Sequence, residues 1–129
     1  MRKSLSLLIL ICMSVVAITA IAQDTGSITA TDASKYVGQK KMVCGKVVST
    51  KFLSSNSKQP TFLNLDKPYP NQVFTIVIWG SDRKNFSKPP ETEYADKELC
   101  VTGVITSYKD KPEIVASAPT QIQIVTYQK

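Results

Sequence analysis

The sequence contains no histidine, a single tryptophan and only three cysteines among its 129 residues. Without histidine there is no Ser–His or Cys–His pair for nucleophilic catalysis and no imidazole ligand for a metal. The five glycines are too scattered to form a phosphate-binding loop, and no C-x-x-C spacing indicates redox chemistry. These absences predict a protein that is not an enzyme and that has no metal or other cofactor.

Long segments with the 3.6-residue hydrophobic period of a helix are also missing, which excludes an all-α fold. Acidic residues are in the minority, because 16 Lys and Arg face 10 Asp and Glu and give a net charge of +6. This mildly basic balance is compatible with an anionic partner, and equally with simple solubility.

The N-terminus has the three parts of a secretory signal peptide. Residues 1–3 carry two cations, residues 5–16 are almost wholly apolar, and Ala20 and Ala22 are small residues before a cleavage site at Gln23. The apolar run is too short to span a bilayer comfortably, which disfavours the alternative of a permanent anchor. We therefore predict export to a periplasm or to the outside of the cell, with no stable membrane insertion after cleavage.

Lipidation is not expected, because Ile11 stands where a lipoprotein signal needs a small residue before Cys12. The other two cysteines, Cys44 and Cys100, lie beyond the predicted signal peptide. In a small exported domain such a pair is more often a disulfide than a metal site, since zinc needs about four ligands. Two buried, unpaired thiols are the alternative.

Most of the remaining chain has the β-branched and aromatic character of strands, in segments 42–50, 61–65, 73–79, 99–108, 113–116 and 122–127. Helical turns are expected at 31–36 and 81–86, each capped by a Thr, Asp or Ser side chain. Gly45 and Gly103 lie near the centres of two long strands, which suits a small barrel because its strands must bend to close.

A family resemblance rests on five of these segments. V-C-G-K-V from Val43, F-L-N-L from Phe62 and F-T-I-V-I-W from Phe74 resemble the first three strands of OB-fold domains of the anticodon-binding type. Residues 99–105 and 112–115 resemble the fourth and fifth strands of that family. The resemblance implies an all-β fold, a five-stranded OB-type Greek-key barrel with a short helical turn between strands three and four.

The resemblance also divides the chain into domains. The OB-type barrel domain would cover residues 36–129. A signal peptide, residues 1–22, and a polar leader with a helical turn, residues 23–35, would precede it.

Strand alternation predicts which side chains face a ligand, because OB-fold domains bind across the outer face of strands two and three. In 61–65, Leu63 and Leu65 form the core pair, so that Phe62 and Asn64 face outward. Residues of 73–79 divide in the same way, with Phe74, Ile76 and Ile78 on the core face and Val73, Thr75, Val77 and Trp79 on the outer face.

Phe62 and Trp79 side by side would form a stacking surface for bases. In the family, the residue at the position of Phe62 stacks on a nucleotide. A register error of one residue would instead bury either ring. The rims carry Lys51, Lys58, Arg83 and Lys109. These side chains suit phosphates or, because acidic residues lie among them, an ordinary solvated surface.

The predicted ligand-binding residues are therefore Phe62, Asn64, Thr75, Trp79, Lys51, Lys58, Arg83 and Lys109. We expect a non-catalytic module that binds single-stranded DNA or RNA without strong sequence preference. An exported OB domain that binds a protein or an oligosaccharide in the same groove is the alternative. Glu91 and Glu93 lie in a proline-flanked polar loop, which is typical of solvated carboxylates.

Overall fold

The computed structural model describes residues 26–128, so the predicted signal peptide lies outside the described residues. The fold is mostly β, as the sequence predicts. The described residues form eight strands: β1 (Ile28–Thr29), β2 (Lys40–Phe52), β3 (Thr61–Leu65), β4 (Phe74–Ile78), β5 (Glu98–Val104), β6 (Thr106–Tyr108), β7 (Lys111–Val115) and β8 (Ile122–Ile124). Helical segments are short: η1 (Ala33–Tyr36), η2 (Gly80–Asn85), α1 (Pro90–Glu93) and η3 (Pro119–Gln121).

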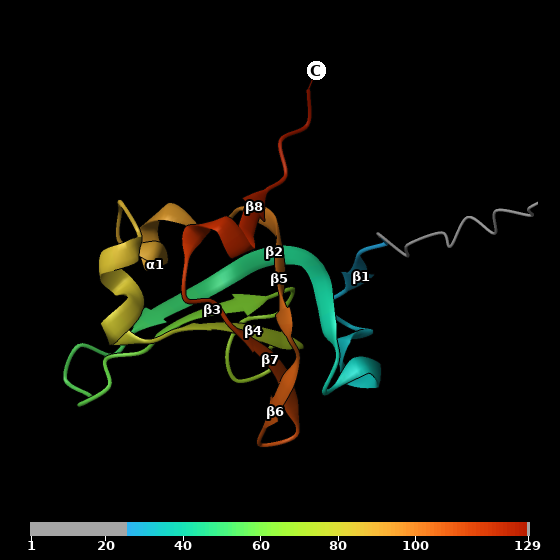
Figure 1. Ribbon diagram of the computed structural model, residues 1–129, viewed down its shortest axis with the longest axis horizontal. Coiled ribbons are helices and arrows are strands. Elements are labelled where there is room, and N and C mark those ends of the chain that lie inside the picture. The colour runs from blue at the N-terminus through green and yellow to red at the C-terminus, as the bar shows by residue number, and fades with distance from the viewer. Residues whose placement is uncertain (1–25, 129) are drawn as a thin grey trace, which may run out of the picture.

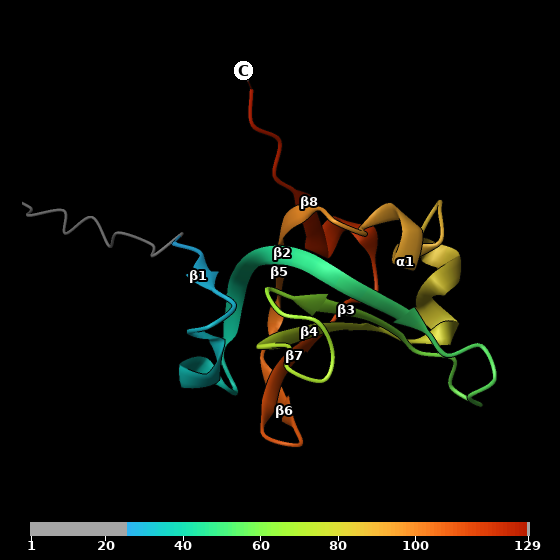
Figure 2. The same cartoon turned by 180° about the vertical axis from the view of Figure 1, so that it is seen from behind.

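The strands form one sheet with the order β6-β7-β4-β3-β2-β5-β8, and β1 pairs with β2 outside this path. The long, bent strand β2 organises the sheet, because its first half pairs with β5 and its second half with β3 (Figures 1 and 2). A register shift between Val47 and Ser49 lies where β2 passes from one partner to the other. Pairs β4–β7 and β1–β2 are parallel, and all other pairs are antiparallel.

The core lies on the face of the sheet that alternation predicts. Leu63 and Leu65 of β3 are fully buried, as are the alternate residues of β4, Phe74, Ile76 and Ile78. They pack with buried residues of the other strands, among them Val43, Val47, Leu99, Val101 and Ile114. This single cluster confirms the predicted core face of both strands, and it leaves the opposite face of β3 and β4 for other contacts.

Several element boundaries differ from the predictions. The predicted strand 99–108 is divided at Ile105 into β5 and β6, and β8 ends at Ile124 rather than at Tyr127. The expected helix caps are wrong: the residue before η1 is Asp32 and the residue before η2 is Trp79, and neither makes a side-chain cap hydrogen bond.

The hairpin turn between β6 and β7 is formed by Lys109 and Asp110. Tyr108 pairs with Lys111, and both turn residues have positive φ angles, 49° and 62°. A two-residue turn with two left-handed residues matches the twist of antiparallel strands.

The predicted disulfide between Cys44 and Cys100 is present in the structure. The two cysteines are directly opposite each other in the pairing of β2 with β5. Alternation places them on the side of the sheet away from Val43 and Val101, which are in the core. The bond therefore crosslinks two neighbouring strands from outside the core.

Candidate functional site

Two rows of side chains cross the outer face of the sheet. The strand registers align Ser49, Asn64, Thr75 and Glu113 in one row and Lys51, Phe62, Val77 and Val115 in the next. Each row takes one residue from β2, β3, β4 and β7, and alternation directs all of them away from the core. The outer face is therefore a continuous surface that is polar in one row and mainly apolar in the next.

A groove of about 740 Å³ lies on this surface. Three aromatic rings line it: Phe62 from β3, Tyr69 from the loop after β3, and Tyr108 from the end of β6. Tyr69 and Tyr108 are 74% and 61% exposed, and the Lys109 ammonium group lies 5.4 Å from the centre of the Tyr108 ring. The lysines that line the groove are Lys51, Lys109 and Lys111.

The floor of the groove is a chain of hydrogen bonds. The Thr75 hydroxyl donates to Asn64 Oδ1 (3.2 Å), and Asn64 Nδ2 donates to Ser49 Oγ (3.0 Å). Asn64 and Thr75 are only 3% and 6% exposed. Both predicted site residues therefore lie at the groove, where they hold the floor in one arrangement and offer little surface to a ligand.

The loop after β3 forms one wall and is fastened at several points. The Lys111 ammonium group donates to the carbonyl oxygens of Pro70 and Gln72, and the Tyr69 N–H donates to Ser49 Oγ (3.3 Å). These bonds hold the Tyr69 ring at the groove and direct the charge of Lys111 toward the loop. Among residues 26–128, Gln72 Oε1 is the one buried side-chain polar atom without a hydrogen-bond partner, and Gln72 lines this wall.

Glu113 is the one acidic residue in the groove lining. Burial raises the pKa of its carboxyl group above the ordinary value of 4.5. A buried carboxylate binds its proton more readily, since the charged form loses hydration. This single acidic group therefore opposes an anionic ligand less as the pH falls.

The structure brings together five of the eight predicted ligand-binding residues in this groove: Lys51, Phe62, Asn64, Thr75 and Lys109. Trp79 and Lys58 line a different hollow, of about 480 Å³, at the end of β4. The stacking surface that joins Phe62 and Trp79 stays a prediction: the two rings line different hollows, and Phe62 pairs with Val77, two residues before Trp79. Val77 is on the outer face, as predicted, but it is only 1% exposed and so offers no surface to a ligand.

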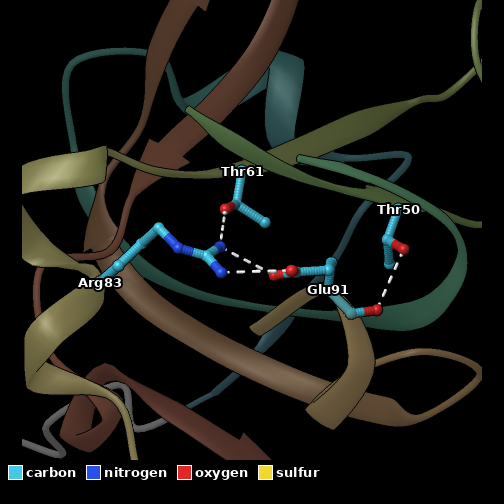
Figure 3. A network of polar contacts seen from close by, with 4 residues as sticks. All are labelled: Thr50, Thr61, Arg83 and Glu91. Carbon is cyan, nitrogen blue, oxygen red and sulfur yellow. Dashed lines mark hydrogen bonds and ion pairs between the residues drawn. The ribbon is translucent and has the colours of Figure 1, made fainter. Parts of the chain in front are cut away.

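Arg83 lies in neither hollow and is not a free cation. Its guanidinium forms a bidentate ion pair with Glu91 (2.8 and 3.2 Å) and donates to the Thr61 hydroxyl (2.6 Å) (Figure 3). Its Cζ atom lies 3.7 Å from the centre of the Phe52 ring. The Thr50 hydroxyl donates to the Glu91 backbone oxygen (3.0 Å), so the network ties η2 and α1 to the ends of β2 and β3.

The same network corrects the expectation that Glu91 is a solvated loop residue. Proline begins a helix readily, and α1 starts at Pro90. The hydrogen bonds from Arg83 hold the pKa of the Glu91 carboxyl below its ordinary value of 4.5, although burial acts against them. Glu91 and Arg83 are thus a structural pair, with side chains 23% and 20% exposed.

We expect Arg83→Met to lower the free energy of unfolding by about 1–3 kcal/mol at pH 7, because it leaves a half-buried carboxylate without its partner. Because Glu91 has a lower pKa when folded, the contribution of the pair is complete above 4.5 and is lost as the pH falls through the folded pKa. Urea denaturation at pH 7 and at pH 3 tests both statements, and the difference from the unchanged protein should shrink at pH 3.

Lys88→Met is the matched control. Lys88 is 71% exposed and lies 3.7 Å from a carboxylate oxygen of Glu93. Such a surface pair contributes little, so we expect a change under about 0.5 kcal/mol. Equal losses from the two variants would contradict the structural role of Arg83.

The predicted ligand-binding residues do not include Tyr69, Tyr108, Gln72 or Lys111. The prolines on both sides of Tyr69 indicate a rigid loop, but not the surface that the loop covers. Among the described residues, no group of His, Cys, Asp and Glu side chains is arranged to hold a metal ion. Within residues 26–128 there is also no helix with the length and apolar character needed to cross a membrane.

Comparisons with known proteins find structural likeness only. No family model matches the chain, and no curated protein matches its sequence significantly. A putative aspartyl-tRNA synthetase from Leishmania major Friedlin is similar in structure, with a TM-score of 0.50 and 12% identity over 85% of this chain. The aspartyl tRNA synthetase of Entamoeba histolytica matches 74% of this chain with a TM-score of 0.44 and 15% identity. This chain covers only 22% and 20% of those chains, and at this identity the likeness concerns the fold.

Proposed function

We propose that the chain is a non-catalytic module that binds single-stranded nucleic acid in the groove between Tyr69 and Tyr108. The observation that carries the proposal is the presence of three aromatic rings and two outward lysines in one groove with a fixed polar floor. Every base presents a flat π face, so exposed rings bind bases without selecting a sequence. Lys51 and Lys109 supply charge for the phosphates.

The energetic terms are large enough for this function. Stacking of a base on an aromatic side chain contributes about 1–3 kcal/mol. The fastened loop holds the Tyr69 backbone and a tight hairpin holds the Tyr108 backbone, so the backbone at both rings loses little freedom on binding. Protonation of Glu113 at lower pH removes the negative charge that would oppose phosphate.

We infer further that the sheet is an OB-type barrel. Ile105 alone separates β5, which pairs with β2, from β6, which pairs with β7. The path β2-β3-β4-β7-β6 therefore returns to β2 through β5, which is the connectivity of a five-stranded barrel. The structural likeness to part of an aspartyl-tRNA synthetase is consistent with the resemblance to anticodon-binding OB domains. The name of that enzyme includes tRNA, a nucleic acid, which agrees with the proposed class of ligand.

We also propose export. The Cys44–Cys100 disulfide supports it, because such bonds persist in oxidising compartments and are rare in the cytosol. The N-terminal residues that would direct export have the order of a signal peptide in the sequence.

A labelled oligodeoxythymidylate of twelve nucleotides, dT12, tests binding by fluorescence anisotropy. If two or three phosphates are contacted, the affinity should fall about 7- to 20-fold between 50 and 200 mM salt, since each contact contributes about 0.7 to the log–log slope. The double variant Lys51→Ala/Lys109→Ala should reduce that slope by about 1.4. Undetectable binding of dT12, or binding that does not depend on salt, would exclude the proposed function.

The control removes the same charge elsewhere. Lys35 and Lys88 are exposed, do not line the groove and pair with carboxylates on their own side of the molecule. Lys35→Ala/Lys88→Ala should leave the slope of log affinity against log salt unchanged. That slope depends on the number of lysines that contact phosphates, and Lys35 and Lys88 lie outside the groove. Equal slopes for the two double variants would exclude this groove as the binding site.

A further inference from the structure

The hollow that contains Trp79 is built by a close approach of two segments. The turn 57–59 lies against Gly80, whose N–H donates to the Lys58 carbonyl oxygen (3.0 Å). A Cβ atom on Gly80 would lie 2.8 Å from that oxygen, so a side chain at this position would push the segments apart. The hollow is lined by Ser57, Lys58, Gln59, Trp79, Gly80 and Ser81.

Trp79 lies on the same sheet face as the groove. Its backbone is still extended, with φ −71° and ψ 150°, so the alternation of β4 continues to it. Thr75, Val77 and Trp79 therefore follow one another on the outer face, with Thr75 at the groove and Phe62 opposite Val77. At about 3.3 Å per residue, Trp79 is roughly 13 Å along the strand from Thr75.

We propose that the Trp79 hollow is a second subsite, which binds a further nucleotide of the same single strand that occupies the groove. The inference rests on the proposed function. The rise of a helical strand is about 3.4 Å per nucleotide, so roughly 13 Å corresponds to about four stacked nucleotides, and fewer in an extended strand. A mononucleotide or dinucleotide fills the groove alone, and a longer strand reaches both positions.

The chemistry of the hollow suits a nucleotide. The indole of Trp79 offers a flat face, and the lining adds hydroxyl and amide groups from Ser57, Gln59 and Ser81. The Lys58 ammonium lies 5.8 Å from the centre of the indole ring, close enough to serve a phosphate beside a stacked base. Its contact with the ring contributes about 0.5–1 kcal/mol at an exposed site, less than a stacked base provides.

Trp79 is the only tryptophan in the sequence, so the protein's tryptophan emission reports this subsite alone. Emission should be quenched by dT8 and dT12. The dinucleotide dT2 should leave emission unchanged, although it competes with labelled dT12 for the groove. Trp79→Ala should weaken dT12 binding about 5- to 100-fold, the equivalent of one stacked base. It should leave the Kd of dT2, calculated from the competition and the Kd of dT12, unchanged, and Trp79→Phe should restore most of the affinity for dT12.

Lys58→Ala provides a second test that does not alter the ring. The Lys58 side chain is exposed, so its removal should not affect folding, and it should weaken dT12 binding while sparing dT2. Salt-dependent binding of dT12 without quenching of Trp79 would overturn the second subsite and leave the proposed function intact. Quenching by dT2 as strong as by dT12 would overturn it too. No binding of dT12 in the anisotropy assay would overturn both.

Discussion

Replacement of both Cys44 and Cys100 by serine is expected to lower the free energy of unfolding by about 4 kcal/mol. The disulfide joins residues 56 positions apart, and a crosslink of that length removes many conformations from the unfolded chain. Small domains are stable by only about 5–15 kcal/mol, so this loss is a large fraction of the total. Urea denaturation of the double variant and of the unchanged protein under oxidising conditions measures the difference.

Reduction provides the control for this result. A thiol reductant should lower the stability of the unchanged protein to about that of Cys44→Ser/Cys100→Ser and should not affect the variant. Strands β2 and β5 pair with each other on both sides of the disulfide. We therefore expect the reduced protein to keep the same fold. A loss below about 1 kcal/mol would mean that the unfolded chain is already confined near these strands.

The core followed from the sequence because strand alternation is a local property. Leu63 and Leu65 of β3, and the alternate residues of β4 from Phe74, could be assigned to one face without any knowledge of their partners. The residues of the outer face, Phe62 among them, were predicted as those that remained after the core residues had been assigned, and Phe62 lines the groove. Alternation gives direction only, so it did not predict that Val77 is covered.

The walls of the groove could not be predicted, because they depend on contacts between distant residues. Tyr69 reaches the groove because Lys111, 41 residues from Pro70, binds the carbonyl oxygens of its loop. No local pattern encodes that contact. The hollow at Trp79 was unpredictable for a similar reason, since it depends on the turn 57–59 that lies against Gly80.

The charged residues were the least predictable part of the site. The local sequence around a lysine or arginine in a loop does not show whether its side chain is free or forms an ion pair. Lys51 and Lys109 lie at the groove as predicted, and Arg83 lies in a bidentate pair with Glu91. The pair joins two short helical segments whose relative position cannot be predicted from the sequence. Because Glu91 was expected to be solvated, it was not considered as a partner for Arg83.

Gly103→Ala is expected to lower the free energy of unfolding by about 1–3 kcal/mol, the usual cost of overpacking a core. A Cβ atom on Gly103 would lie 2.6 Å from Cγ2 of Ile114, a fully buried residue of β7. The sequence suggested that this glycine lets a strand bend, but the structure shows that it lets β7 pass close to β5. Where space allows, Gly→Ala stabilises by about 0.4–1 kcal/mol, so the sign of the change tests the close approach.

A double-mutant cycle with Ile114→Ala identifies the cause. Ile114→Ala alone should cost about 2–5 kcal/mol, because it leaves a cavity in the core. It also removes the Cγ2 atom that the new methyl group would meet, so the double variant should lose about 1–2 kcal/mol less than the sum of the single variants. Gly38→Ala is the additive control: Gly38 has a φ of 90°, and a Cβ there would meet no atom within 4 Å. Its cost is backbone strain and should be the same with or without Ile114. Additive losses for Gly103→Ala and Ile114→Ala, measured by urea denaturation with the disulfide intact, would show that the two strands do not pass as closely as the structure indicates.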